Sequence, residues 1–199
     1  AQITINFKNE VDVPTTLHSH GIRVDNANDG VPDVTQKAIQ PGQSFTYTLK
    51  LPDAGVYWYH PHVREDYAQE LGLYGNFLVT PSSENYWSPV NRDLALILDD
   101  ILIEDGAIVP FAKTQADRAL MGRFCNIMLI NGNDAYHLNA KQGEVVRLYL
   151  TNAANTRTFN FAIDGAKMKL VGGDRGAYER DEWKDEVSID QSARAVVGV

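Results

Sequence analysis

The sequence predicts an all-β protein built as a sandwich or a barrel, and two observations carry this prediction. Short segments of alternating polar and apolar residues, or of aromatic and β-branched residues, recur along the 199-residue chain, as is typical of strands that bury one face. Turn-forming clusters such as NDGVPD and LPDAG separate these segments. Many short strands divided by Gly, Pro and Asp turns are typical of sandwiches and barrels.

Four strands are expected in the first part of the chain. Residues 2–7 (QITINF) and 44–51 (SFTYTLKL) alternate with a period of two, and the turn PGQ introduces the second of them. Residues 55–60 (GVYWYH) are aromatic and β-branched, and residues 73–79 (LYGNFLV) are mainly apolar. Residues 81–92 are polar and carry two prolines, which is typical of a linker.

The strand pattern restarts after this linker. Further strands are expected at 94–100, 127–132, 144–152, 167–173 and 194–199. We expect the segment at 113–122 to be a loop rather than a helical turn. The sequence therefore predicts a first domain at 1–80, a linker at 81–92 and a second domain at 93–199.

The two halves resemble each other in one stretch. ITINFKNEVDVPTTLHSHG in the first half parallels VRLYLTNAANTRTFNFAIDG in the second. Each contains an alternating strand, an asparagine, a turn and a second strand that ends in glycine. Asn9 therefore aligns with Asn152 and, with one inserted residue, Gly21 aligns with Gly165. This parallel indicates two copies of one β-domain, and the second copy carries no histidine after His137.

Composition and charge narrow the classes of partner and site. The formal net charge is -8, which argues against nucleic acid or an anionic membrane as a partner. No apolar run approaches the roughly 18 residues of a membrane helix. Because Cys125 is the only cysteine, neither an intrachain disulfide nor a zinc cluster built from several cysteines can form.

Four of the five histidines stand in two His-x-His pairs, TLHSHG and YWYHPH. Alternate residues of a strand share one face, so His18 and His20 project together, as do His60 and His62. If the two strands are neighbours, four imidazoles meet, and neutral imidazole is a good ligand for copper, zinc, iron or nickel. His137 has no partner motif, and we expect it to be structural or exposed.

The ligand chemistry favours particular metals. Sites made of imidazole, without thiolate or carboxylate, suit copper or zinc better than magnesium or calcium. One zinc ion held by all four histidines remains an alternative at this point. Two parallel pairs suit a cluster of several ions better.

The residues quoted above resemble the N-terminal part of a multicopper oxidase, the laccase-like family of blue copper enzymes. The matching stretches are LHSHGIRVDNANDGVPDVTQKAIQPGQSFTYTL, GVYWYHPH and LGLYGNFLV, and in the second half GEVVRLYLTNAANTRTFNF and KMKLVGGD resemble the family's middle domain. The resemblance implies two cupredoxin-like Greek-key domains. It also implies copper as the cofactor and an export pathway to the periplasm or the exterior.

The resemblance implies a role for each paired histidine. His18 would bind the type 2 copper, His20 and His60 one of the two type 3 coppers, and His62 the other. In the family these three ions form a trinuclear cluster where dioxygen is reduced to water with four electrons. Asp29, in NDGVP, matches an acidic position associated with proton supply, and a plain Asp-Gly turn is the alternative interpretation.

The chain departs from the family pattern because it contains no His-Cys-His motif. The family's C-terminal domain supplies a His-Cys-His motif that completes the cluster and builds the type 1 copper. Cys125, in GRFCNIM, has no flanking histidine, and we expect it to be a buried apolar thiol. We also expect the first domain to lack its N-terminal strands and the second to be incomplete at its C-terminal end.

We therefore expect a fragment, or one chain, of a laccase-like oxidase that is inactive alone. Its partners would be dioxygen, a reductant (a phenol, an aromatic amine or a metal ion), and a C-terminal cupredoxin domain. The alternative is a non-catalytic module that stores or carries copper on the same four histidines. A third interpretation is a purely structural β-sandwich whose histidines hold no metal.

Overall fold

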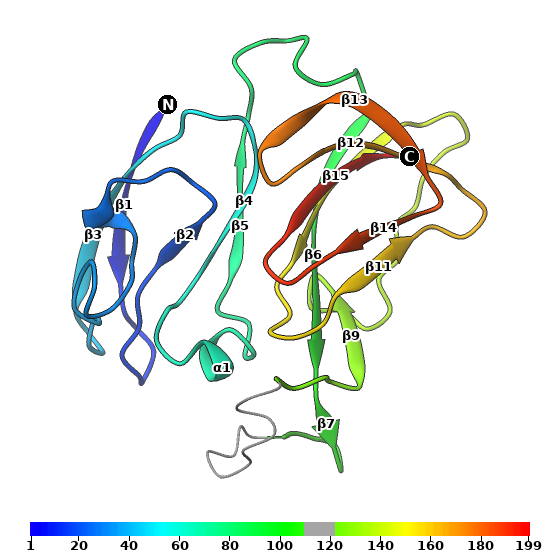
Figure 1. The fold of residues 1–199 in the computed structure, drawn as a ribbon. Coiled ribbons are helices and arrows are strands. Elements are labelled where there is room, and N and C mark those ends of the chain that lie inside the picture. The colour runs from blue at the N-terminus through cyan, green and yellow to red at the C-terminus, as the bar shows by residue number, and fades with distance from the viewer. Residues whose placement is uncertain (110–121) are drawn as a thin grey trace.

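The computed structural model describes residues 1–109 and 122–199, and nearly all of its regular structure is β-strand (Figure 1). This confirms the predicted all-β class. Helix in these ranges is confined to the four-residue α1 (Glu65–Ala68) and the short 3-10 helix η1 (Asn26–Asn28). No helix within them is long and apolar enough to span a membrane. The loop expected at 113–122 falls, apart from Gly122, outside the described residues.

The first group of strands forms two small antiparallel sheets. Its members are β1 (Gln2–Lys8), β2 (His18–His20), β3 (Ser44–Lys50), β4 (Gly55–His60) and β5 (Gly75–Val79). β1 pairs with β3, while the other three form a sheet in the order β2-β4-β5. Every second residue of β1 is half-buried, as its alternating sequence predicts. The core between the sheets includes Leu17, Ile39, Tyr47 and Leu49.

The second group centres on a six-stranded sheet in the order β13-β12-β15-β10-β6-β9. Its strands are β6 (Arg92–Ile101), β7 (Ile103–Glu104), β8 (Ala107–Ile108), β9 (Ile127–Ile130), β10 (Val146–Asn152), β11 (Phe159–Ala162), β12 (Met168–Gly173), β13 (Gly176–Lys184), β14 (Glu186–Ile189) and β15 (Arg194–Gly198). β11 pairs with β14, and β7 with β8, in separate two-stranded ladders. β10 is buried along its whole length, as expected of a central strand.

Four of these strands, β7, β8, β13 and β14, do not follow from the sequence pattern. β13 reads GAYERDEWK and is exposed at most positions. It forms one edge of the six-stranded sheet, and charged residues on an edge strand discourage pairing with other chains. The same charges remove the apolar alternation by which a strand is recognised.

β4 is the strand that joins the two groups. Its Val56 packs with Tyr149 of β10 and Val196 of β15 in a buried cluster, and the two groups lie side by side along β4 and β5 (Figure 1). β5 ends at Val79 and β6 begins at Arg92, while the division into domains at these points remains a prediction. This packing holds β4, and with it His60 at its end, against the second group of strands.

Candidate metal centre

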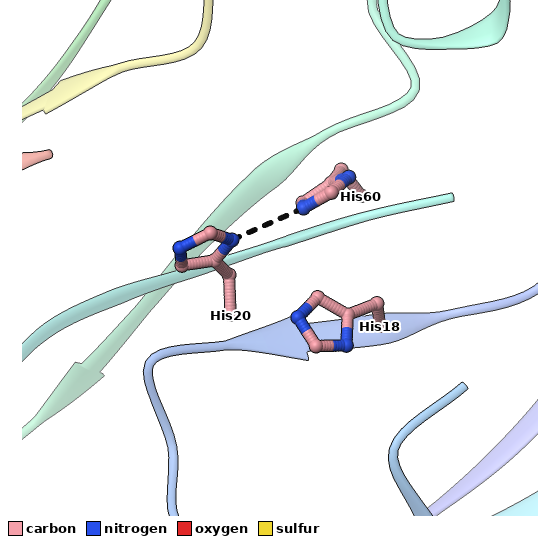
Figure 2. Close-up of side chains that lie close together, drawn as sticks. All are labelled: His18, His20 and His60. Carbon is pink, nitrogen blue, oxygen red and sulfur yellow. Dashed lines mark hydrogen bonds between the residues drawn. The ribbon is translucent and has the colours of Figure 1, made fainter. Parts of the chain in front are cut away.

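The register of β2 on β4 determines which histidines meet. The strands are antiparallel, with His18 opposite His60 and His20 opposite Trp58. Ser19, between the two histidines of β2, turns the other way and is buried, as the strand alternation predicts. The side chains of His18, His20 and His60 therefore point toward one another from two neighbouring strands (Figure 2).

The three rings are close enough to share a metal site. The potential ligand atoms of His18, His20 and His60 all lie within 4.8 Å of one another. Nδ1 of His20 and Nε2 of His60 are 3.2 Å apart, the contact drawn as a dashed line in Figure 2. The indole of Trp58 stacks on the His60 ring with their centroids 4.2 Å apart, which restricts the orientation of that ring.

His62 lies beside this group rather than within it. Its ring centroid is 4.4 Å from that of His18 and 5.0 Å from that of His60. Its backbone N–H donates to Oγ1 of Thr16 at 3.1 Å, which ties the segment after β4 to the segment before β2. The structure thus places all four predicted ligands in one neighbourhood, with three of them in the tightest cluster.

Hydrogen bonds donated by Nδ1 leave Nε2 as the unprotonated nitrogen in three of the four rings. Nδ1 of His18 is 2.6 Å from the carbonyl oxygen of Asp29, and Nδ1 of His60 is 3.0 Å from that of Pro61. Nδ1 of His62 pairs with the Glu65 carboxylate. Because these oxygens can only accept, each Nδ1 carries the proton, and this is the arrangement that supporting groups impose on metal-bound histidines.

Glu65 is a site residue that the sequence analysis missed. It lies in α1, three residues after His62. The preceding Arg64 has φ of 53°, so the chain turns sharply between the histidine and its carboxylate partner. The His-x-x-Glu spacing was the available signal, and it was uninformative without knowledge that a helix begins at Glu65.

Asp29 contacts the cluster through its backbone and its side chain. Its carboxylate Oδ1 is 3.4 Å from Nδ1 of His18, beside the carbonyl contact already described. The next residue, Gly30, has φ of 76°, and a Cβ there would collide with the carbonyl of Leu17. The Asp-Gly turn therefore has a structural reason of its own, while proton supply by Asp29 remains a prediction.

Burial favours the neutral form of the His18, His20 and His60 imidazoles. It lowers the pKa of His20 to about 3, with a further contribution from the Arg194 guanidinium, and that of His60 to about 4, with a further contribution from His18. Burial also lowers the pKa of His18. Neutral rings present the lone pairs that a transition metal needs. The donor set therefore fits copper or zinc.

The remaining histidine and the cysteine lie apart from this cluster. His137 is exposed, in agreement with one of the two expectations for it. Cys125 is buried, as expected, but it is not the purely apolar thiol that the sequence analysis expected. Its Sγ lies 3.2 Å from Oε1 of the buried Glu70, and burial together with that carboxylate raises the pKa of the thiol. Nothing in the local sequence GRFCNIM indicates this partner, because Glu70 is 55 residues away.

Comparison with known families matches most of the chain. Residues 1–84 and residues 93–184 match two family models, and both are described as multicopper oxidase. The chain belongs to the multicopper oxidase family. This confirms the resemblance noted from the histidine pairs, and membership of this oxidoreductase family implies copper as the metal.

Curated multicopper oxidases align with nearly the whole chain. The multicopper oxidase mco of Staphylococcus aureus is 28% identical over 200 residues, which cover 97% of this chain and 43% of that protein. A laccase of Arthroderma benhamiae is 34% identical over 188 residues, covering 87% of this chain and 28% of the laccase. The chain thus spans less than half the length of these relatives.

Solved structures of multicopper oxidases confirm the cupredoxin-like fold. The enzyme from Pseudomonas thermotolerans superposes with a TM-score of 0.89 at 33% identity, over 100% of this chain and 48% of that one. The blue copper oxidase from Nitrosomonas europaea gives 0.84 at 28% identity, over 99% of this chain and 62% of that one.

Proposed function

We propose that this chain supplies part of the trinuclear copper cluster of a laccase-like oxidase. In that role dioxygen is reduced to water, while a phenol, an aromatic amine or a low-valent metal ion is oxidised at a type 1 copper held elsewhere. The observation that carries the proposal is the convergence of His18, His20 and His60 from the paired strands β2 and β4, with His62 beside them.

Each histidine has an assigned place in the proposal. His18 would hold the type 2 copper, His20 and His60 one type 3 copper, and His62 the other. Bound copper supplies the one-electron redox chemistry that dioxygen reduction requires. The protein's part is to present neutral Nε2 atoms in fixed directions, which the Nδ1 contacts to Asp29, Pro61 and Glu65 support.

Asp29 would supply protons in this scheme. Its carboxylate is 33% exposed and lies 3.4 Å from Nδ1 of His18, so it touches both solvent and the ring of a proposed ligand. A carboxylate in this position can take a proton from water and pass it toward the cluster. Reduction of dioxygen to water consumes four protons, and such a route is therefore needed.

The remaining ligands would come from outside these 199 residues. Within residues 1–109 and 122–199, His18, His20 and His60 form the one group of three or more potential ligands with suitable spacing, and the sequence holds no His-Cys-His motif. We therefore propose a further cupredoxin domain, on the same or another polypeptide, as the source of the type 1 site. The chain alone is then inactive as an oxidase. By analogy with the family we also place the protein in the periplasm or outside the cell.

The test uses the complete oxidase that contains this chain, loaded with copper. We expect blue absorption and oxygen consumption with a phenolic reductant. His60→Ala should abolish oxygen consumption and leave the blue absorption intact, because the type 1 site lies elsewhere, and His137→Ala should change neither. Full oxygen consumption by His60→Ala would refute the proposal. Copper binding without any oxidase activity in the complete wild-type protein would favour the carrier alternative.

A further inference from the structure

The two residues that follow α1 are polar and yet buried. Gln69 and Glu70 are each only 5% exposed. Nε2 of Gln69 donates to the carbonyl of Ala153 at 2.8 Å, directly after β10 in the second group of strands. Burying polar side chains is costly unless they find partners, and the first of the two finds its partner across the boundary between the strand groups.

Glu70 makes a denser set of contacts across the same boundary. Its Oε1 accepts from Nη2 of Arg123 and lies 3.2 Å from Sγ of Cys125. Its Oε2 accepts from Nδ2 of Asn155 at 3.2 Å. The Glu70 and Arg123 side chains are 3% and 2% exposed. Every one of these partners belongs to the second half of the chain, so Glu70 attaches the end of α1 to that half.

The other end of α1 supports a proposed copper ligand. Glu65, its first residue, pairs with Nδ1 of His62. The helical turn between the two ends is closed by backbone bonds from Ala68 to Arg64 at 2.7 Å and from Gln69 to Glu65 at 3.2 Å. A hydrogen-bonded turn therefore connects the partner of His62 to the anchor in the second group of strands.

We propose that Glu70, assisted by Gln69, is a positioning residue for the copper cluster. Its ion pair with Arg123 holds α1 against the second group of strands, and α1 in turn holds Glu65 where it orients the His62 imidazole. The second half of the chain contributes no proposed ligand, but through this connection it sets the position of one. The inference rests on the proposed function for the role of His62 as a ligand.

The ionic character of the Glu70–Arg123 contact indicates that it orients α1, because contact between the two strand groups alone does not require an ion pair. A buried ion pair is seldom more stabilising than apolar packing of the same volume, and the neighbouring boundary contact of Val56 with Tyr149 and Val196 is apolar. Hydrogen bonds from Arg123 and Asn155 to separate oxygens of one carboxylate fix its direction, which apolar packing does not do.

The test is a double-mutant cycle on Cu(II) binding by the chain. The four proteins are wild type, Glu70→Gln, His62→Ala and the double variant, and the matched control is Tyr74→Phe. Tyr74 also bonds across the boundary, to Oδ2 of Asp99 at 2.6 Å, but it lies beyond α1. We expect Glu70→Gln to weaken binding about 10-fold when His62 is present and less than about 2-fold when it is absent. Tyr74→Phe should change the Kd less than about 2-fold.

A second readout does not depend on copper. In the metal-free chain, Glu70→Gln should shift the ring ¹⁵N resonances of His62 while those of His137 stay in place. Equal losses of affinity with and without His62, or an unshifted His62 ring, would overturn the positioning role. If Glu70→Gln does not fold, Asn155→Ala replaces it. That variant removes one hydrogen bond to the Glu70 carboxylate, and the same changes in Cu(II) affinity and in the His62 resonances are expected.

If the wild-type chain binds no Cu(II), the proposed function fails. The His62 resonances still decide whether Glu70 positions that ring.

Discussion

Two asparagine turns, one in each half of the chain, are built alike. Nδ2 of Asn9 donates to the carbonyls of Val13 and Ile39, both at 2.9 Å, and its Oδ1 accepts from the N–H of Val11 at 3.0 Å. Asn152 repeats this arrangement. Its Nδ2 donates to Arg157 at 2.7 Å and Ile189 at 2.9 Å, and its Oδ1 accepts from Ala154 at 2.9 Å. Of the two carbonyls that each asparagine binds, the one closer in sequence is four residues after Asn9 and five residues after Asn152. This difference of one agrees with the inserted residue that the alignment requires.

The two halves differ in what the shared turn leads to. In both halves the segment after the turn pairs with the isoleucine whose carbonyl accepts from the asparagine. Thr15 forms an isolated bridge with Ile39, and Phe159 of β11 pairs with Ile189 of β14. Counting the inserted residue, Ala162 and Asp164 occupy the positions of His18 and His20, and both are exposed. One backbone arrangement is therefore used twice, and under the proposed function the metal chemistry depends on a few side chains carried by only one copy.

Among the tests of this comparison, we expect the largest change in Cu(II) affinity when a single histidine of the first half is replaced. We expect His60→Ala to weaken Cu(II) binding by more than about 100-fold, because a lost ligand costs more than a lost supporting group. His137→Ala, in the second half, should leave the affinity unchanged. Isothermal titration of both variants measures this, and equal losses would show that the copper is not held where the comparison places it.

The two asparagine turns should be equally important for stability. Asn9→Ala and Asn152→Ala each remove three hydrogen bonds and leave backbone groups without partners. We expect each to lower the free energy of unfolding by about 3 kcal/mol, as measured by urea denaturation. A cost confined to one of the two would mean that the turns are alike in geometry but not in energy.

The aligned glycines should differ by a smaller amount. Gly21 and Gly165 have φ of 82° and 73°, so alanine at either position costs about 1–2 kcal/mol. A Cβ at Gly165 meets open space, whereas one at Gly21 collides with Nη2 of Arg194. That guanidinium is buried and donates to the carbonyls of Ser192 and Asp174, so it cannot move aside freely. Gly21→Ala should therefore cost about 1–3 kcal/mol more than Gly165→Ala. Gly42→Ala, also in open space at φ of 81°, is the control and should match Gly165→Ala.

The smallest effect concerns the response of the metal-free protein to acid. The pKa values of His20 and His60 are lowered to about 3 and about 4, so between those values and about 6.5 the unfolded chain binds more protons than the folded one. Stability is therefore lost as the pH falls through this window, by no more than about 1 kcal/mol per pH unit for rings that solvent partly screens.

Asp99, in the second half, should act in the opposite direction. Burial raises its pKa to about 7, so its contribution to stability is complete below the ordinary value and is lost as the pH rises toward 7. Asp99→Asn should steepen the acid loss between pH 4 and 6.5, and His60→Gln should flatten it. Urea midpoints measured across that range check both signs, and a change in the wrong direction for either variant would exclude the assigned cause.

The fold and the clustering of the paired histidines were largely predictable because both depend on short sequence patterns. β4 begins at Gly55 and ends at His60 as its aromatic and β-branched run predicts, and the His-x-His spacing places two rings on one face of β2. Glu70 and Arg123 could not be paired in advance, because 53 residues separate them and neither lies in a periodic segment. Contacts that depend on how two sheets meet leave no local pattern.

The central claim is that the copper ligands supplied by this chain all belong to its first half, on β2 and at or just after the end of β4. A crystal structure of the copper-loaded protein, with anomalous differences recorded at the copper edge, tests it directly. We predict strong peaks within bonding distance of the His18, His20, His60 and His62 rings and none among residues 93–199. Peaks at His137 or elsewhere in the second half, or rings that turn away from every copper ion, would contradict it.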